Sequence, residues 1–332
     1  MSECRPHELM NFPEGQAFTI AHLSDLHATD VRLGSPRDVL GKRALGWLSW
    51  RHRRRHEHQA SVLRALIADL HQRAPDHIAI TGDLTHLGLP SEIAAATNWL
   101  ERIGPAEQVS VVPGNHDAYA GAEGAERWLP WRHYMGDLAG PPADADDADA
   151  DARGFPWIRR IGGHIALIGI SSARPTAPLL ATGRVGARQR ARVEALLATL
   201  AAEGRVRIVL LHHPPVAAGQ SRRRQLDDAA EVRALLTRAG AELLLHGHTH
   251  ECHEGVVRGP HGPIPVLGVA SSSSAGPRPA RRARYRLVRI VPERATDGTP
   301  RCRISWQLRG FDAATGGFVA ETEEPALAHS AG

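Results

Sequence analysis

The stretch FTIAHLSDLH, residues 18–27, joins a short apolar run to a polar end that carries Asp25 and His27. A short run of this kind is typical of a strand that is buried on both faces of a sheet. Asp25 and His27 are two residues apart, so their side chains leave the same face of an extended segment. The stretch therefore predicts a buried strand that ends in two potential metal ligands.

The same arrangement recurs along the chain and predicts the fold class. Eight further apolar runs predict strands: HIAITGDLTH (77–86), QVSVVPGNHD (108–117), HIALIGISS (164–172), RVRIVLLHHPP (205–215), AELLLHGHTH (241–250), PIPVLGVASSSS (263–274), RYRLVRIV (284–291) and RISWQLRGF (303–311). Helical periodicity predicts helices at 58–74, 91–103, 187–203 and 227–240, with Ser91 as an N-cap and Gly240 as a C-cap. Strands that alternate with helices indicate a layered α/β fold, and we expect the strand-rich last third to complete a second sheet.

Composition fits one large globular domain in a reducing compartment. The chain has 332 residues, of which 42% are apolar and 23% charged. Its net charge of +4 is mild, so an anionic partner must be met by local clusters. The three cysteines, Cys4, Cys252 and Cys302, are far apart and indicate neither a disulfide framework nor a cysteine metal cage. A polar N-terminus and the lack of a long apolar run predict a cytoplasmic protein with no membrane span.

Changes in composition suggest how the chain is divided. We interpret residues 1–17 as an N-terminal extension, 18–315 as a single catalytic domain and 316–332 as a C-terminal tail, of which 322–332 is expected to be frayed. Within the domain, the tryptophan- and arginine-rich segment 41–58 is interpreted as an insertion. The acidic, alanine-rich segment 141–154 is interpreted as a solvated, mobile loop.

Residues that bind metals close one predicted strand after another. In open α/β sheets the carboxyl ends of the strands are the edge at which ligands bind. Imidazole and carboxylate ligands without thiolate suit manganese or iron, with zinc as a third choice. The chain offers more of these ligands than one ion can bind, so we expect two ions about 3.5–4 Å apart, bridged by a carboxylate and a hydroxide. The candidates are Asp25, His27, Asp83, Asn115, His116, Asp117, His212, His213, His248 and His250.

The motifs D-L-H, G-D, G-N-H-D, H-H-P and G-H-T-H, in this order, resemble those of the calcineurin-like metallophosphoesterase family. The resemblance covers about residues 18–272. It implies a four-layer αββα sandwich of two mixed sheets, with two divalent metal ions at one sheet edge. It also implies a metal-dependent hydrolase that cleaves phosphoric esters.

The same resemblance assigns a role to each motif position. Asp25, His27 and His250 would hold the first metal, Asp83 would bridge, and Asn115, His212 and His248 would hold the second. His212 is preferred to His213 because the family's ligand lies two residues before the proline, here Pro214. His116 would be a histidine that binds no metal and assists the leaving group, with Asp117 orienting its ring.

Several other polar residues near these motifs have less specific interpretations. His86 follows the G-D motif and is either a substrate contact or a surface-turn residue. His22 is interpreted as a core or edge histidine and His246 as buried support. Ser271 to Ser274 are assigned to a loop.

The segment GKRALGWLSWRHRRRHEH, residues 41–58, has apolar residues at helical spacing followed by a cluster of arginines. We expect it to flank the metal site. It is first interpreted as a helix whose tryptophans pack on the domain, second as an element that meets anionic lipid, and third as a nucleic-acid contact. Trp47, Trp50 and Arg51 are its candidate substrate contacts.

The expected reaction is hydrolysis of a phosphodiester or pyrophosphate bond in a phosphorylated small-molecule or lipid-linked substrate. A nucleotide-containing substrate such as a cyclic nucleotide comes first. The alternative is a UDP-2,3-diacylglucosamine pyrophosphatase of lipid A synthesis, peripheral to the inner face of a membrane. A weaker alternative is a non-enzymatic membrane or nucleic-acid adaptor with structural metals. Nucleic acid is the least favoured partner.

Overall fold

The structure is a computed structural model that describes residues 16–27, 29–34, 38, 41–119, 124–139, 154–276, 278–294, 300–323 and 327–330. Nearly all of the predicted acidic loop, 141–154, and of the predicted N-terminal extension, 1–17, lies outside these ranges. Among the described helices, none is both long enough and apolar enough to cross a bilayer.

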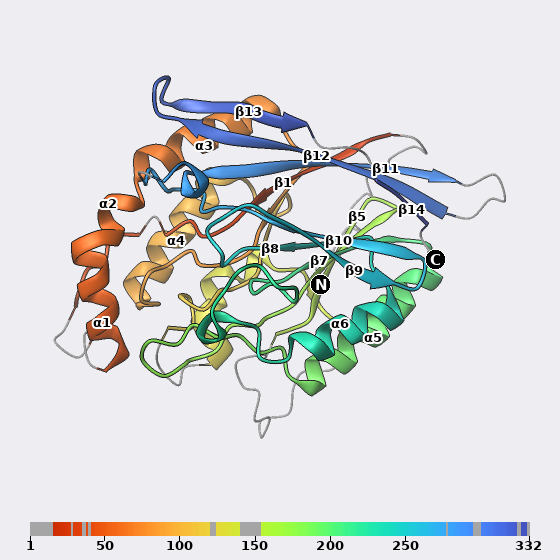
Figure 1. Cartoon of the computed structure of the whole chain (residues 1–332), viewed down its shortest axis with the longest axis horizontal. Coiled ribbons are helices and arrows are strands. Elements are labelled where there is room, and N and C mark those ends of the chain that lie inside the picture. Colours follow the sequence, from red (N-terminus) through yellow and green to blue (C-terminus); the bar gives the residue numbers. More distant parts are fainter. Residues whose placement is uncertain are drawn as a thin grey trace, which may run out of the picture.

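Two seven-stranded mixed sheets form the centre of the molecule (Figure 1). The first has the order β13-β12-β11-β1-β2-β3, with β14 also paired to β12. In it β1, β2 and β3 are parallel, whereas β11, β12 and β13 are antiparallel. Its strands are β1 (Phe18–Leu23), β2 (His77–Ile80), β3 (Val109–Val111), β11 (Arg284–Arg294), β12 (Pro300–Asp312), β13 (Gly317–Glu323) and β14 (Leu327–Ser330).

The second sheet has the order β4-β5-β6-β7-β8-β10-β9. Strands β6, β7, β8 and β10 are parallel neighbours, and β4, β5 and β9 add antiparallel pairs at its two edges. Its strands are β4 (Asp137–Leu138), β5 (Trp157–Ile161), β6 (Ile165–Gly169), β7 (Val206–Leu210), β8 (Leu243–His246), β9 (His253–Gly259) and β10 (Gly262–Gly268).

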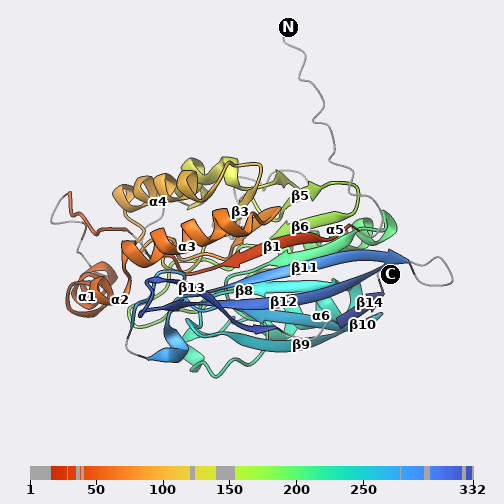
Figure 2. The same cartoon turned by 90° about the horizontal axis from the view of Figure 1, so that it is seen from above.

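Helices cover the outer face of each sheet, so the predicted αββα arrangement is confirmed (Figure 2). Helices α3 (Ala60–Arg73) and α4 (Pro90–Ile103) lie on the first sheet, and α5 (Ala187–Ala202) and α6 (Ala229–Ala239) lie on the second. The segment 41–58 forms α1 (Lys42–Ser49), a π-helical turn (Trp50–Arg54) and α2 (Arg55–Glu57). Short 3₁₀ segments lie at Gly124–Tyr134, Arg222–Arg224 and Pro279–Arg281.

Side-chain alternation in the second sheet explains its uninterrupted apolar runs. In β6, Leu167 faces the core between the sheets, whereas Ala166 and Ile168 face α5 and α6. In β8, Leu243 and Leu245 face the first sheet and Leu244 faces the helices. Each strand is therefore apolar on both faces, as expected of a sheet covered on both sides.

The last third of the chain differs in part from prediction. Strands β9 and β10 do complete the second sheet, but β11, β12 and β13 extend the first one beside β1. The predicted tail also contributes β13 and, within the part expected to be frayed, β14; both pair with β12, and Phe318 of β13 is 7% exposed and packs against Tyr285 and Phe311. Burial of this aromatic side chain adds to the backbone pairing that holds β13 in the sheet.

Of the two predicted helix caps, one is correct and one is wrong. Gly240 ends α6 with φ of 75°, as expected for glycine after a helix. Helix α4 begins at Pro90 with Leu89 as its N-cap, so Ser91 is not the cap. The physical reason is the buried Glu92 carboxylate, which accepts hydrogen bonds from the backbone N–H groups of Leu87 and Leu89.

Candidate metal centre

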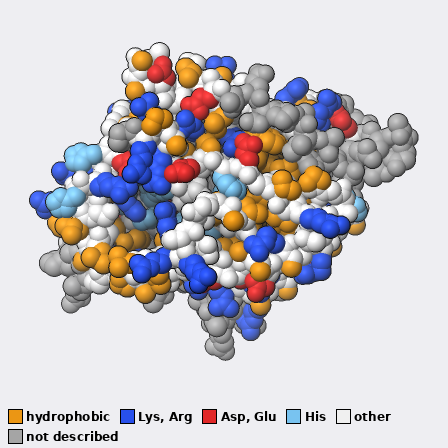
Figure 3. All heavy atoms as spheres, viewed as in Figure 1, with side chains coloured by type: hydrophobic (Ala, Val, Ile, Leu, Met, Phe, Trp, Pro, Cys, Tyr) orange, Lys and Arg blue, Asp and Glu red, His pale blue; other side chains and the backbone are white. Residues whose placement is uncertain are grey.

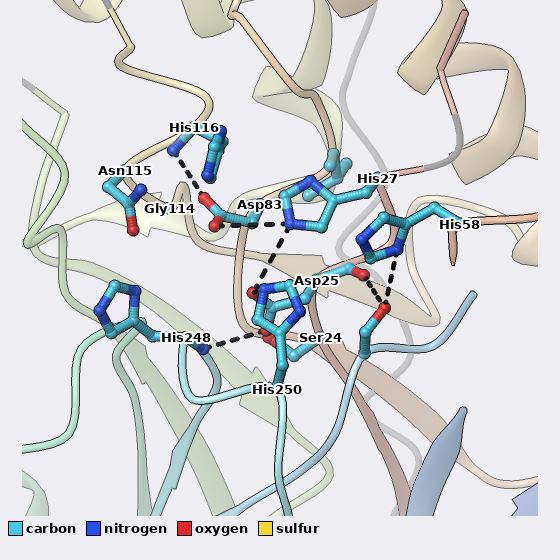
Figure 4. A network of polar contacts seen from close by, with 12 residues as sticks. Ser24, Asp25, His27, His58, Asp83, Gly114, Asn115, His116, His248 and His250 are labelled. Carbon is cyan, nitrogen blue, oxygen red and sulfur yellow. Dashed lines mark hydrogen bonds and ion pairs between the residues drawn. The ribbon is translucent and has the colours of Figure 1, made fainter. Parts of the chain in front are cut away.

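The predicted ligands meet where strands of both sheets end (Figure 4). Asp25 and His27 follow β1, Asp83 follows β2, and Asn115 follows β3 in the first sheet. From the second sheet, His212 follows β7, and His248 and His250 follow β8. Loops from two sheets therefore supply one buried constellation, as the strand-end pattern predicted.

The backbone at these positions is held in an unusual conformation. Five of the candidate ligands have a positive φ, although none of them is glycine: Asp25 (51°), His27 (41°), Asp83 (55°), His248 (70°) and His250 (56°). Such left-handed conformations cost about 1–3 kcal/mol each in a non-glycine residue and persist only where the surrounding fold imposes them. Their concentration in one place is typical of a functional site.

The first group of ligand atoms comes from Asp25, His27, Asp83 and His250, which lie within 4.8 Å of one another. The Nδ1 atom of His27 donates to the carbonyl oxygen of Thr85 at 2.7 Å, which leaves the Nε2 lone pair free. That Nε2 is buried without a hydrogen-bond partner among the described residues. It lies 3.9 Å from Asp25 Oδ1 and 3.8 Å from Asp83 Oδ2. A lone pair that faces two carboxylates fits a bound cation.

Charge and burial around this group also suit a cation. Burial lowers the pKa of His27 well below its usual range, so its ring is neutral, as a ligand must be. Burial alone would raise the pKa of Asp25, but His250 and His212 hold it below its usual range, so the carboxylate is ionised. Its Oδ1 lies 3.2 Å from His250 Nε2.

The second group is built around His212, whose Nδ1 donates to the carbonyl oxygen of Thr81 at 2.6 Å. Its Nε2 lies 3.4 Å from Asp83 Oδ2 and 3.2 Å from Asn115 Oδ1. Burial opposes protonation, but the Asp83 and Asp25 carboxylates raise the pKa of His212 to about 9, so metal and proton compete for Nε2. His248 donates from Nε2 to the Arg224 carbonyl at 2.9 Å, which leaves its Nδ1 for the site.

Asp83 is shared by the two groups, because its Oδ2 lies near both His27 and His212. His213 offers a ligand atom within 4.8 Å of those of His212 and His248, but its ring nitrogens lie 2.8 Å from Ser172 Oγ and 3.3 Å from the Ala181 carbonyl, whereas Nε2 of His212 faces the candidate ligands Asp83 and Asn115. The geometry therefore favours His212 over His213 as a ligand. The donor set fits two divalent ions with Asp83 between them.

A layer of small residues behind Asp25 fixes its position. Asp25 Oδ2 accepts from the backbone N–H of His248 at 3.0 Å, and Ser271 Oγ donates to the Asp25 carbonyl at 2.7 Å. A Cβ atom on Gly247 would lie 1.8 Å from Ser24 Oγ and 2.7 Å from Asp25 Oδ2. Only glycine allows this close approach. Ser271 was predicted only as a loop residue, because its supporting role depends on contacts 246 residues apart.

Gly247→Ala should weaken metal binding, since the added methyl group displaces the Asp25 carboxylate. A loss of about 10–100-fold in affinity is expected, as for other changes behind metal ligands. Titration of the metal-free protein with Mn²⁺ by calorimetry measures it. The control is Gly34→Ala, where the nearest heavy atom would be 3.6 Å away. Equal affinities for the two variants would contradict the predicted role of Gly247.

His116 and Asp117 are both buried, but they do not form the predicted pair. The His116 ring is oriented by the His86 carbonyl, which accepts from Nδ1 at 2.6 Å. Asp117 accepts from the backbone N–H groups of Gly114 and Thr85 at 2.9 and 3.0 Å, so it braces the loops instead. The prediction that Asp117 orients the His116 ring is therefore wrong. Burial and the neighbouring Asp83 raise the pKa of Asp117 to about 7.

His86 contributes its backbone carbonyl rather than its side chain. Its ring is 2% exposed and stacks on His27 with 5.1 Å between ring centroids. It is not a surface-turn residue, and the described residues that line the adjoining cavity do not include it. His22 and His246 are fully buried, as predicted.

His58 is a site residue that the sequence pattern did not single out. It is buried, and its ring centroid lies 4.7 Å from that of His27. Its Nδ1 lies 3.0 Å from Ser273 Oγ, and its ring offers a ligand atom within 4.8 Å of those of His27 and His250. No motif contains it, and its place at the start of a predicted helix gave no signal.

The segment 41–58 is helical and flanks the site, as expected. Trp47 and Trp50 are half-buried against Val31, Leu87 and Leu89, as in the packed-helix interpretation. Arg51 is exposed and lies over the Trp47 ring, 5.2 Å from its centroid. The cavity lining, as far as it is described, contains none of Trp47, Trp50 and Arg51, so the structure places these predicted substrate contacts outside it.

A different arginine of this segment reaches the site. The π-helical turn Trp50–Arg54 carries Arg54, whose Nη1 donates to His116 Nε2 at 2.9 Å. π-Helical turns are frequent at functional sites. Burial and then Arg54 lower the pKa of His116 well below its usual range. The sequence did not single out Arg54, because it is one of four arginines between residues 51 and 55 and nothing distinguishes it from the others.

A cavity of about 300 Å³ opens onto the ligands. Asp83, Asn115, His116, His248 and His250 line it together with four arginines, Arg53, Arg54, Arg224 and Arg281. Figure 3 shows Lys and Arg side chains gathered around a hollow on this face. The site is therefore a cationic opening above a buried set of metal ligands, which suits an anionic substrate.

Comparisons with known proteins agree with this site. Residues 18–252 match the family model described as calcineurin-like phosphoesterase. A curated relative from Synechococcus sp., named as a probable cyclic nucleotide phosphodiesterase, is 24% identical over 247 residues, which cover 73% of this chain and 81% of the relative.

A dimetal phosphatase of known structure shows the same fold at low identity. A dimetal phosphatase from Danio rerio has a TM-score of 0.56 and 13% identity, covering 92% of this chain and 99% of that one. The sulfate thiohydrolase SoxB from Thermus thermophilus has a TM-score of 0.46 and 17% identity, and the match covers 89% of this chain and 57% of that one.

Proposed function

This chain belongs to the calcineurin-like phosphoesterase family, and we propose that it hydrolyses a phosphodiester or pyrophosphate bond in a nucleotide-containing substrate. As a member it is a metal-dependent phosphoric ester hydrolase. The observation that carries the proposal is the cluster of possible ligand atoms of Asp25, His27, Asp83 and His250, beneath a cavity lined by arginines. The name of the Synechococcus relative supports a cyclic nucleotide as the first substrate to test.

In the proposed mechanism, Asp25, His27 and His250 would hold one ion, Asn115, His212 and His248 would hold the other, and Asp83 would serve both. Manganese or iron suits these ligands best. Two divalent ions, when bound, supply Lewis acidity and an activated water nucleophile. The chain's own residues then have to position the phosphoryl group and assist the leaving oxygen.

His116 and Arg54 are placed to assist the leaving oxygen. Both line the cavity, and the Arg54 guanidinium donates to His116 Nε2. A leaving oxygen that enters between them would take over this contact. Since its pKa is lowered, the resting His116 ring is neutral, with its proton on Nδ1 and Nε2 as an acceptor; Arg54 would stabilise the negative charge of the leaving oxygen, and Nε2 would relay to that oxygen a proton taken from water.

The test is turnover of cyclic AMP with Mn²⁺, before and after chelation. We expect hydrolysis that disappears with the chelator and returns with added Mn²⁺. Hydrolysis of neither cyclic AMP nor bis(4-nitrophenyl) phosphate under any divalent metal would overturn the proposal. Hydrolysis of the nitrophenyl diester alone would keep the phosphodiesterase and exclude the cyclic nucleotide.

A second candidate, a membrane-peripheral UDP-2,3-diacylglucosamine pyrophosphatase, is supported by one observation. Leu45 and Leu48 of α1 are each 48% exposed, on the segment that carries Arg53 and Arg54 to the cavity. The same assay with this lipid in detergent micelles tests it, using Leu45→Ser/Leu48→Ser. Turnover that this variant loses on the lipid but keeps on the nitrophenyl diester would favour the second candidate.

A further inference from the structure

A second, larger cavity adjoins the metal cavity. It has a volume of about 760 Å³ and shares Arg53, Glu57, Arg224 and Arg281 with the first. These four residues therefore form the common boundary of the two spaces. We call the larger cavity the outer groove. A substrate whose scissile phosphoryl group lies at the metal ligands would reach the outer groove past these side chains.

The outer groove is strongly cationic. Arg53, Arg224, Arg278 and Arg281 line it, and Glu57 is its single described carboxylate. The hydrogen bonds and ion pairs of these arginines use only part of each guanidinium. Arg224 donates from Nη2 to the His248 carbonyl, and Arg281 donates from Nε to Glu251. Arg53 Nε lies 3.5 Å from Glu57 Oε2. Since a guanidinium has five N–H donors, several remain to meet an anion.

The positive charge of the arginines that line the outer groove exceeds what is needed to bind the reacting phosphoryl group. The metal ligands and Arg54 already serve that group inside the smaller cavity. Arg53, Arg224 and Arg281 lie between the two cavities, and Arg278 lines the outer groove alone, so the positive charge continues beyond the metal cavity and indicates a second anionic group on the same molecule. Guanidinium groups bind phosphate oxygens in a bidentate manner, which makes a phosphoryl group the best match.

We propose that the outer groove binds a second phosphoryl group of the substrate. The proposal rests on the proposed phosphodiesterase activity and specifies its substrate class. The substrate is a nucleotide diester or pyrophosphate that carries a further phosphate away from the scissile bond. A cyclic mononucleotide, which has a single phosphate, leaves the outer groove empty.

The test compares two thymidine compounds that differ only in this group. Both carry a 5′-(4-nitrophenyl) phosphate diester, and one also carries a 3′-phosphate monoester. In each, water adds to the 5′ phosphorus, the bond from phosphorus to the nitrophenyl oxygen breaks, and 4-nitrophenolate leaves. The measured quantity is kcat/KM for each compound with Mn²⁺, and the ratio of the two values.

The wild-type protein should prefer the 3′-phosphorylated compound by about tenfold or more, the effect of one charge-assisted hydrogen bond. Arg53→Gln/Arg281→Gln should bring the ratio close to one, mainly through KM. Arg64→Gln/Arg258→Gln removes two charges from exposed positions on α3 and β9 and should keep the wild-type ratio.

A wild-type ratio near one would overturn the proposal, as would an unchanged ratio in Arg53→Gln/Arg281→Gln. These outcomes are distinct from failure of the proposed function, in which neither compound releases 4-nitrophenolate with any divalent metal. Direct binding gives a readout independent of turnover. In calorimetry, thymidine 3′,5′-bisphosphate should bind the wild-type protein more tightly than thymidine 5′-monophosphate, and the groove variant should bind both equally.

Discussion

Asp83→Asn is expected to leave a folded protein with less bound metal and activity reduced by more than about 10³-fold. Asp83 Oδ2 lies near ligand nitrogens of both groups, 3.8 Å from His27 and 3.4 Å from His212. Loss of its charge therefore affects both ion positions at once. The effect should exceed that of removing one positioned hydrogen-bond donor, which typically costs 10²–10³-fold.

Elemental analysis of the purified variant, together with turnover of bis(4-nitrophenyl) phosphate, checks this expectation. Asparagine keeps the shape of the side chain and can still accept from the His116 backbone N–H, which now lies 2.7 Å from Asp83 Oδ1. Asp30→Asn, at an exposed position near the first motif, is the matched control and should behave as wild type. A fully metallated and active Asp83→Asn protein would refute the shared-ligand assignment.

The second large effect is expected from His116→Gln. Its kcat should fall by about 10²–10⁴-fold, the usual contribution of a positioned acid or base, while the metal content stays that of the wild type. His116 is placed by the His86 carbonyl and lines the cavity, but the metal-ligand groups among the described residues do not include it. Activity should therefore be lost without loss of metal.

The leaving group provides a sharper check on His116. A 4-nitrophenolate leaves without a proton, whereas an alkoxide needs one, so the variant should lose far more activity on an alkyl diester than on a nitrophenyl diester. Equal losses on both substrates would assign His116 to phosphoryl binding instead of proton transfer. Loss of metal in the variant would show that the ring acts as a ligand or a support.

The strands and candidate ligands were predictable because their signals are local. Each apolar run and its polar end lie within about ten residues, as in FTIAHLSDLH. An uninterrupted apolar run also indicates that a strand is buried on both faces. The order of the motifs added the family resemblance. The fold class follows from these two facts, and the structure confirms it.

The supporting contacts were not predictable, because they join distant parts of the chain. Arg54 meets His116 across 62 residues, and Ser271 meets Asp25 across 246. Asp117 shows a different limit. Because His116 is its neighbour in sequence, it was the predicted partner, but in the folded chain the Asp117 carboxylate accepts from the backbone N–H groups of Thr85 and Gly114. Adjacency along the chain says little about where a side chain points in a turn.

The left-handed backbone at Asp25, His27, Asp83, His248 and His250 affects which substitutions are expected in a copy of the gene that no longer needs to encode an active enzyme. At about 1–3 kcal/mol each, five such residues together rival the 5–15 kcal/mol net stability of a whole domain. Replacing any of them by glycine removes that cost from the folded state. A duplicated copy freed from selection for catalysis would therefore gain stability by losing its metal ligands, and its relics would be identified by glycines at these five positions.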